Sequence, residues 1–319
     1  MEMKTRERRL FHLLCGLLVL MACCFRTGAV LQEGVADPTV EQPEPFLYIR
    51  PTEPENRGDP PIGEEKEIQP LGNYPLSMPT IGEESIDNRW GGQLDIDALL
   101  QKELSSAIGE DPWVLILHTH GSEAYGDKEG YRSDDPASNV IRVGAEIAQA
   151  LEKAGIPTIH DTTAYDLQAG YNSAYEAAAK AIETHLDNYP RIRVVIDVHR
   201  DAAPDGQGGQ KALTAQLQGT SAAAMMLVMG TDTAELPHEN WQDNLAFALR
   251  LQDYIGTDAP GIMRKISLRS ARYNEHFTPC SLLLEVGSAG NSLQEAICSG
   301  RYFGQKLGEF LKTLQQGGK

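Results

Sequence analysis

Short apolar runs alternate with longer segments of helical periodicity along the second two thirds of the chain. The apolar runs predict β-strands at residues 114–118, 156–160, 193–199, 225–230 and 281–287. Apolar positions that recur with a period near 3.6 predict helices at residues 94–104, 137–154, 173–185, 240–254 and 292–314. Because buried strands that alternate with helices favour a parallel sheet, we expect an α/β fold whose mostly parallel sheet is covered by helices on both faces.

Turn and cap residues mark the ends of the helix expected at 137–154. Asp135 is placed as an N-cap with Pro136 at the first helical position, and Gly155 follows the last periodic residue. Glycine commonly ends a helix because it adopts a left-handed backbone conformation at little cost. The pattern therefore predicts that this helix begins next to Asp135 and ends at Gly155.

The first thirty residues have the pattern of an export signal. Four basic residues precede an apolar stretch at 10–25 that carries no full charge. This arrangement predicts an uncleaved membrane anchor, with the bulk of the chain on the extracytoplasmic side. A loosely lipoprotein-like sequence at 20–23 leaves open the alternative that Cys23 is lipidated.

Residues 31–89 are rich in proline and acidic residues and show no sustained period. Such a composition buries too little apolar surface to offset the entropy of ordering, so we expect a disordered spacer. The predicted organisation is therefore an anchor at 1–30, a flexible spacer at 31–89 and a folded domain at 90–319.

The charge and the cysteine content argue against a nucleic-acid-binding protein and against a disulfide-rich scaffold. The 319 residues include 45 acidic and 28 basic side chains, a net charge of −17, which disfavours binding to nucleic acid. Only Cys280 and Cys298 lie outside the apolar N-terminal stretch. Two cysteines make no disulfide scaffold, so we expect two buried thiols or at most one bridge.

Three of the predicted strands end in residues that carry chemistry. His118 and His120 follow the first strand with Glu123 close behind, His199 ends another, and Glu285 interrupts the apolar run of a third. If these strands are parallel neighbours, the side chains gather at one edge of the sheet. A carboxylate inside an apolar run is costly unless it has a partner or a function.

Two histidines and one carboxylate are a common ligand set for catalytic zinc, which leaves a fourth position for water. His120, Glu123 and His199 provide that set, and we predict that they bind zinc. Glu285 is the candidate general base and acid, because hydrolysis of an amide needs a group that takes a proton and then returns it.

Spacing alone does not choose between the first two histidines, since residues two apart share one side of an ideal strand. We favour His120 as the ligand because Gly121 gives the backbone freedom there and the H-x-x-E spacing to Glu123 is short. His118 would then lie behind the ligands or face the substrate.

The carboxylate ligand also has alternatives. Asp134 or Asp135 could replace Glu123. Asp197, two residues before His199, is a candidate for orienting that histidine or an attacking water, with a purely structural role as the alternative.

Six segments together resemble the stage II sporulation protein P family of endospore-forming bacteria. The resemblance covers about residues 90–317, and its motifs, which occur in order, are HTHGSEAY (118–125), ASNVIRVGAEIAQALEKAGI (137–156), IDVHRDA (196–202), HENWQDNLAFA (238–248), ARYNEHF (271–277) and LLLEVGSAGNSLQEA (282–296). The N-terminal anchor and variable spacer are also similar to that family's layout.

The resemblance implies a zinc-dependent N-acetylmuramoyl-L-alanine amidase fold that acts on peptidoglycan, with an associated endopeptidase activity on peptide cross-links. It implies a role in engulfment of the forespore, at the septal or engulfing membrane, with a lytic transglycosylase and a membrane scaffold protein as partners. The family's metal and catalytic positions correspond here to His120, His199 and Glu285, with Glu123 as the matching acid.

Four further residues bear on how a substrate would bind. Arg200, Arg264 and Arg269 are candidates for binding peptide carboxylates, although structural ion pairing is the reading that we favour. Glu275 stands where the family usually has glutamine, which leaves a substrate role for this position in doubt.

Two other functions are compatible with the residues. A zinc carboxypeptidase or endopeptidase of the cell wall would use the same ligand set, and the products formed from peptidoglycan would distinguish it. A membrane-tethered scaffold with a degenerate site would bind no metal.

Overall fold

The computed structural model describes residues 82–104, 113–233 and 236–317. The predicted anchor, the possible lipidation site at Cys23 and most of the predicted spacer lie outside these residues, so the division of the chain stays a prediction. Among the described residues, no helix combines the length and apolarity that crossing a bilayer requires.

Strands of the described chain form one large sheet and one small hairpin. The strands of the large sheet are β1 (Ile86–Asn88), β2 (Trp113–Leu117), β3 (Thr158–His160), β4 (Ile192–Asp201), β7 (Met225–Gly230), β8 (Ile266–Arg269) and β9 (Cys280–Ser288). The hairpin consists of β5 (Thr214–Leu217) and β6 (Thr220–Ala223).

The helices are α2 (Ile96–Leu100), α4 (Val140–Lys153), α5 (Tyr165–Ala169), α6 (Ala174–Asn188), α7 (Trp241–Asp258) and α8 (Leu293–Gly317). Short 3-10 turns are η1 (Glu83–Ser85), η2 (Glu129–Tyr131), η3 (Tyr171–Ser173) and η4 (Glu275–Phe277).

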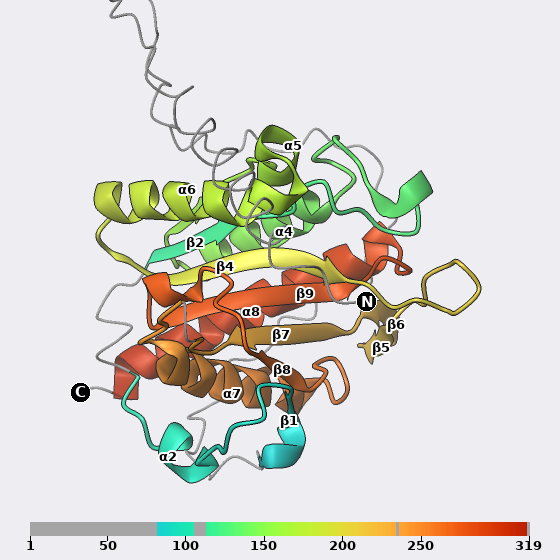
Figure 1. Ribbon diagram of the computed structural model, residues 1–319. Coiled ribbons are helices and arrows are strands. Elements are labelled where there is room, and N and C mark those ends of the chain that lie inside the picture. The colour runs from blue at the N-terminus through green and yellow to red at the C-terminus, as the bar shows by residue number, and fades with distance from the viewer. Residues whose placement is uncertain (1–81, 105–112, 234–235, 318–319) are drawn as a thin grey trace, which may run out of the picture. The chain divides into compact units, whose positions relative to one another are not determined.

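The strand order in the large sheet is β1-β8-β7-β9-β4-β2-β3, and most of it can be followed from one side of Figure 1 to the other. Each pair of neighbours is parallel except β7 and β9, which are antiparallel. The prediction of an α/β fold with a mostly parallel sheet is therefore confirmed.

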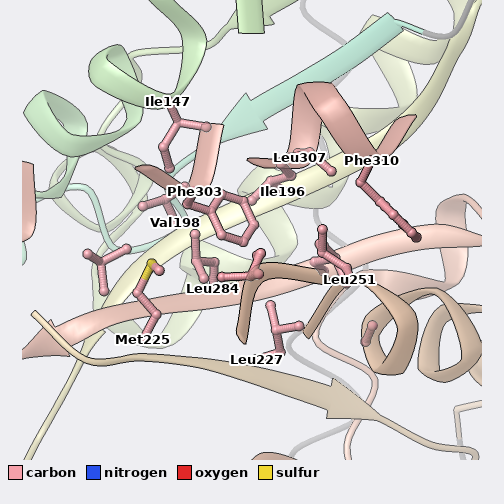
Figure 2. Packing of buried hydrophobic residues seen from close by; sticks show 14 of the residues in the cluster. Ile147, Ile196, Val198, Met225, Leu227, Leu251, Leu284, Phe303, Leu307 and Phe310 are labelled. Carbon is pink, nitrogen blue, oxygen red and sulfur yellow. The ribbon is translucent and has the colours of Figure 1, made fainter. Parts of the chain in front are cut away.

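Alternate residues of β2 and β4 face opposite layers of helices. Ile196 and Val198 of β4 pack in the main core with Phe303 of α8 and Ile147 of α4, as Figure 2 shows. Leu115 and Leu117 of β2 and Val195 of β4 pack instead with α5 and α6, through residues such as Ile182. The prediction that helices cover both faces is confirmed, with α4, α7 and α8 on one side and α5 and α6 on the other.

The start of α4 differs from the prediction. The helix begins at Val140, and its N-cap is Asn139, whose Oδ1 accepts a hydrogen bond from the backbone N–H of Ile141 at 2.9 Å. Asp135 instead closes a turn, since its Oδ1 accepts from the backbone N–H of Ala137 at 3.0 Å. The predicted end is confirmed, because Gly155 has φ +76 and donates its N–H to Glu152 O at 2.8 Å.

Several short elements escaped prediction because they lack a sustained apolar pattern. These are the hairpin of β5 and β6, strands β1 and β8, and helix α5. Strand β1 lies in the stretch that composition assigns to the spacer, and it pairs with β8 at the edge of the sheet. The helix expected at 94–104 is shorter in the structure, where α2 spans Ile96–Leu100.

The two cysteines outside the N-terminal region are both free thiols. Cys280 at the start of β9 is buried, and Cys298 in α8 is partly exposed. Burial raises the pKa of both thiols above the ordinary value, which keeps them protonated.

Candidate metal centre

Strand β2 ends at Leu117, and the chain then turns sharply so that His120 and Glu123 lie on one loop. The backbone N–H of Glu123 donates to the carbonyl of His120 at 3.0 Å, which closes the turn between them. Nδ1 of His120 is 3.9 Å from Oε1 of Glu123. The short H-x-x-E spacing therefore does bring an imidazole and a carboxylate together.

Strand β4, the parallel neighbour of β2, supplies the third residue of the group. Nδ1 of His199 lies 3.4 Å from Oε2 of Glu123. One nitrogen or oxygen atom from each of His120, Glu123 and His199 lies within 4.8 Å of the other two, and all three residues are buried. Segments far apart in the sequence thus converge on one small volume.

The chemistry and spacing of these three groups fit a zinc ion. Tetrahedral ligands at about 2.0–2.1 Å from zinc are separated from one another by roughly 3.4 Å. The separation of 3.4 Å between His199 and Glu123 matches that value, and the 3.9 Å separation at His120 needs only a small closure. The other ring nitrogen of His120, Nε2, is buried and has no hydrogen-bond partner among the described residues, so it is the alternative ligand atom of this residue.

Glu285 occupies the position beside His199 in the adjacent strand. The two residues are register partners in the parallel pair β4 and β9, so their side chains lie on the same face of the sheet. Oε2 of Glu285 is buried and has no hydrogen-bond partner within the described chain. Burial raises the pKa of Glu285 to about 8, the positive charge of His199 opposes this, and the negative charge of Glu123 reinforces it.

Asp197 holds His199 from the other side. Its Oδ1 is 3.0 Å from Nε2 of His199 and accepts the backbone N–H of Thr119 at 2.8 Å, while its Oδ2 accepts the Thr119 hydroxyl at 2.5 Å. Burial alone would lower the pKa of His199, but Asp197 and Glu123 raise it well above the ordinary value. The surroundings of His199 therefore favour positive charge, which is what a bound cation requires.

His118 is not part of this group. Its Nδ1 lies 3.1 Å from the carbonyl oxygen of Val198, and its Nε2 lies 2.9 Å from Nε2 of His160. Burial lowers the pKa of His118 to about 4. Since the strand ends at Leu117, the alternation that would place both histidines on one side does not extend to residue 120.

The other candidates for the carboxylate ligand are not part of the buried group. Asp134 and Asp135 are exposed, and Asp135 is used in the turn before α4. Glu123 is buried, and although burial opposes its ionisation, His199 and Arg200 lower its pKa below the ordinary value. The geometry therefore favours Glu123 over Asp134 and Asp135 as the carboxylate ligand.

The arginines singled out in the sequence make structural contacts. Arg200 donates from Nε to the carbonyl of Ala124 and from Nη2 to that of Tyr131, both at 3.0 Å, and its Nη1 is 3.7 Å from Glu123. Arg264 forms an ion pair with Asp201 at 2.7 Å. Arg200 thus fixes the loop that carries Glu123.

The third arginine of that set, Arg269, donates from Nε to the hydroxyl of Ser267 at 2.7 Å. Ser267 lies two residues earlier in the same strand, β8. This contact within one strand is again structural.

Two tyrosines beside the group were missed by the sequence analysis. The ring of Tyr171 stacks on that of His120 with centroids 4.2 Å apart and an interplanar angle of 10°. The ring of Tyr175 lies 5.5 Å from that of His120 and 6.5 Å from that of His199. They come from η3 and α6, and the sequence YNSAY carries no pattern that links them to the histidine motifs.

A family model described as stage II sporulation protein P matches residues 62–308, most of the chain. The chain belongs to the stage II sporulation protein P family. It is also 27% identical over 204 residues to stage II sporulation protein P of Bacillus subtilis (strain 168), a match that covers 59% of this chain and 48% of the relative. The chain therefore spans about half the length of the curated relative.

Solved structures of N-acetylmuramoyl-L-alanine amidases show a partial likeness. AmiC2 of Nostoc punctiforme is 12% identical with a TM-score of 0.37, and the match covers 64% of this chain and 98% of that one. The catalytic domain of CwlV from Bacillus (Paenibacillus) polymyxa var. colistinus is 13% identical with a TM-score of 0.35, over 63% and 98% of the two chains. Likenesses at this level carry no argument about chemistry.

Proposed function

We propose that the protein is a zinc-dependent peptidoglycan hydrolase that cleaves the amide between N-acetylmuramic acid and the stem peptide. One observation supports this most strongly: His120, Glu123 and His199 converge in a buried group beside Glu285, whose buried Oε2 has no hydrogen-bond partner among the described residues. Two imidazoles, a carboxylate and a separate acid are the parts that zinc-assisted amide hydrolysis needs. Membership of the stage II sporulation protein P family supports peptidoglycan as the substrate.

Zinc bound by the three donors would polarise the amide carbonyl and activate a water molecule. The protein's own contribution is at Glu285, whose carboxylate takes a proton from the attacking water and then donates it to the leaving nitrogen. Burial raises the pKa of Glu285 to about 8 although the positive charge of His199 opposes this, and the charge of a bound zinc ion would lower that pKa further and so favour the ionised carboxylate. Asp197 and Thr119 keep the ring of His199 in place.

The proposal extends to the setting of the reaction. The apolar stretch at 10–25 would anchor the chain in the cell membrane, with the catalytic domain on the extracytoplasmic side during engulfment. A lytic transglycosylase and a membrane scaffold protein, which the family resemblance implies, would be its partners. Cleavage of peptide cross-links is a second reaction that the same site would support.

Digestion of purified peptidoglycan by the full-length protein tests the proposed function. We expect glycan strands free of peptide and stem peptides with a new alanine amino terminus. A chelator should abolish the reaction and added zinc should restore it. New termini within the stems, without release of whole stem peptides, would identify a peptidase instead.

The substitution Glu285→Gln separates metal binding from catalysis. The variant should bind about one zinc per chain and lose activity by two orders of magnitude or more, roughly the scale for a general acid or base. Glu183→Gln, an exposed glutamate on α6, is the matched control and should remain fully active. A wild-type chain that folds but neither binds zinc nor digests the wall would be a scaffold, and the proposal would be wrong.

A further inference from the structure

An exposed apolar surface borders the candidate metal centre. Among the described residues, three large hydrophobic side chains are exposed, and two of them, Leu167 at 53% and Tyr171 at 54%, lie within five positions of each other in α5 and η3. Isolated exposed side chains are ordinary on a protein surface. Tyr171 differs because its ring stacks directly on His120, one of the three candidate ligands.

Arg132 stands next to this ring with its guanidinium held in place. The guanidinium carbon lies 5.1 Å from the centroid of the Tyr171 ring. Nη1 donates to the hydroxyl of Ser122 at 2.8 Å and to Oδ2 of Asp166 at 2.9 Å. The backbone of Arg132 also forms a bridge with Glu123, so the residue belongs to the same loop structure as the candidate ligand.

The guanidinium remains accessible although it is held by these contacts. The side chain of Arg132 is 42% exposed, whereas that of its partner Asp166 is 3% exposed. Within the described chain, both of its side-chain hydrogen bonds leave from Nη1. Nε and Nη2 therefore keep donors available, and an ordered arginine binds a carboxylate with less loss of conformational entropy than a free one.

The other arginine of the site lacks this freedom. The side chain of Arg200 is 9% exposed, and its donors are used by Glu123 and two backbone carbonyls. Arg132 is thus better placed than Arg200 to meet a substrate from solvent. A cationic group in this place is also notable because the whole chain carries a net charge of −17.

We propose that Tyr171 and Arg132 form a recognition surface for a carboxylate-bearing peptide, next to the amide that is cleaved. The inference rests on the proposed function and adds a substrate preference to it. The guanidinium binds a free carboxylate of the stem peptide, and the ring of Tyr171 supports the apolar part of the same peptide. Muropeptides whose acidic groups are free should bind better than those whose acidic groups are amidated.

Binding of muropeptides to the full-length Glu285→Gln protein, loaded with zinc, tests this recognition surface without cleavage of the probe. The probes are two muramoyl peptides that differ only in whether the glutamate and diaminopimelate carboxyls are free or amidated. We expect the free form to bind about tenfold more tightly, the scale of one charge-assisted hydrogen bond. Arg132→Met should abolish this preference, and Arg132→Lys should keep part of it.

Tyr171 and a second arginine complete the set of variants. Tyr171→Ala should weaken the binding of both probes severalfold, and Tyr171→Phe should not. Arg142→Met is the matched control, because Arg142 is also partly exposed and paired with a buried acid, Glu146, but lies on α4. It should leave the preference unchanged.

Two results would overturn the inference. If Arg132→Met still binds the probe with free carboxyl groups more tightly than the amidated probe, the guanidinium does not bind those carboxylates. If Arg132→Met or Tyr171→Ala folds but loses zinc affinity, these residues merely hold His120 in place. Failure of the proposed function gives a different result, since the wild-type chain would then release no peptide-free glycan strands from peptidoglycan, whatever the Arg132 variants bind.

Discussion

Replacement of the buried Glu275 by glutamine should stabilise the protein increasingly as pH rises. Glu275 is 2% exposed, and its Oε2 accepts the backbone N–H of Gly230 at 2.7 Å. Its Oε1 is buried without a hydrogen-bond partner among the described residues. Burial raises the pKa of Glu275 well above its ordinary value, and the negative charge of Asp197 acts in the same direction, against the hydrogen bond from Gly230.

The sign of the effect follows from proton binding in the two states. The unfolded chain releases the proton near the ordinary pKa of 4.5, whereas the folded chain keeps it to higher pH. Each pH unit between these two values therefore lowers the free energy of unfolding by about 1.4 kcal/mol. Below the ordinary pKa both states are protonated and the penalty disappears.

Glutamine removes this dependence without changing the shape of the side chain. Its amide oxygen can keep the hydrogen bond to Gly230, and its amide group takes the place of the protonated oxygen. Between about pH 5.5 and about pH 7.5 the advantage of Glu275→Gln over the wild type should grow with pH, by about 1.4 kcal/mol for each pH unit over which only the folded state keeps the proton.

Urea unfolding of metal-free protein at several pH values measures this difference. Glu183→Gln, which changes an exposed glutamate, should show no advantage that grows with pH. Comparison with the wild type cancels the contributions of Glu285 and the other buried acids, which both proteins share. An advantage of Glu275→Gln that stays constant over this pH range would show that the buried carboxyl is ionised in the folded state, and the reasoning would be refuted.

Three further substitutions or conditions give separate checks on the structure. Gly144→Ala should destabilise the fold by roughly 1–3 kcal/mol in thermal unfolding, because the added Cβ would lie 2.5 Å from the ring of His118. Gly256→Ala, in another helix with nothing within 4 Å of the added Cβ, should be neutral or stabilising, and equal losses for the two variants would contradict the packing described. Asn139→Ala should lower the free energy of unfolding by about 1 kcal/mol, because the N-cap of α4 is lost, and Asp135→Ala should lower it less. A larger loss for Asp135→Ala would indicate that Asp135 is the N-cap, as the sequence predicts. Zinc at a hundred times its dissociation constant should add about 2.7 kcal/mol to the stability of the wild type and little to that of His199→Ala, and an equal gain in both would place zinc elsewhere.

The sequence predicted the central strands well because they are short, apolar and buried. Strand β7 occupies the residues expected, and β2, β4 and β9 differ from expectation by a few residues at their ends. The hairpin of β5 and β6 was missed because residues such as Thr214 and Ser221 give it no apolar run. The misplaced cap of α4 arose because Asp-Pro is typical of both a helix start and a turn, and local sequence does not decide between them.

The grouping of His120, Glu123 and His199 was expected from strand ends, but the roles of their neighbours were not. The role of Arg200 depends on carbonyls of a loop that the sequence does not place, and the contact of Tyr171 depends on how η3 packs over His120. Such contacts are set by tertiary packing, so no spacing rule could have found them. That His118 lies outside the group of candidate metal ligands likewise depends on the residue at which β2 ends.

The alternation of residues in β4 and β9 explains how one sheet provides both a core and a reactive group. Ile196 and Val198 face α8 in the main core, so Asp197 and His199 must face the opposite layer. The register that pairs His199 with Glu285 places that carboxyl on the same face as the histidine. A shift of β9 by one residue would bury Glu285 under α8 and turn apolar neighbours toward the metal centre. The candidate site is therefore stabilised by the same packing of apolar side chains that stabilises the sheet, and its chemistry depends on that register.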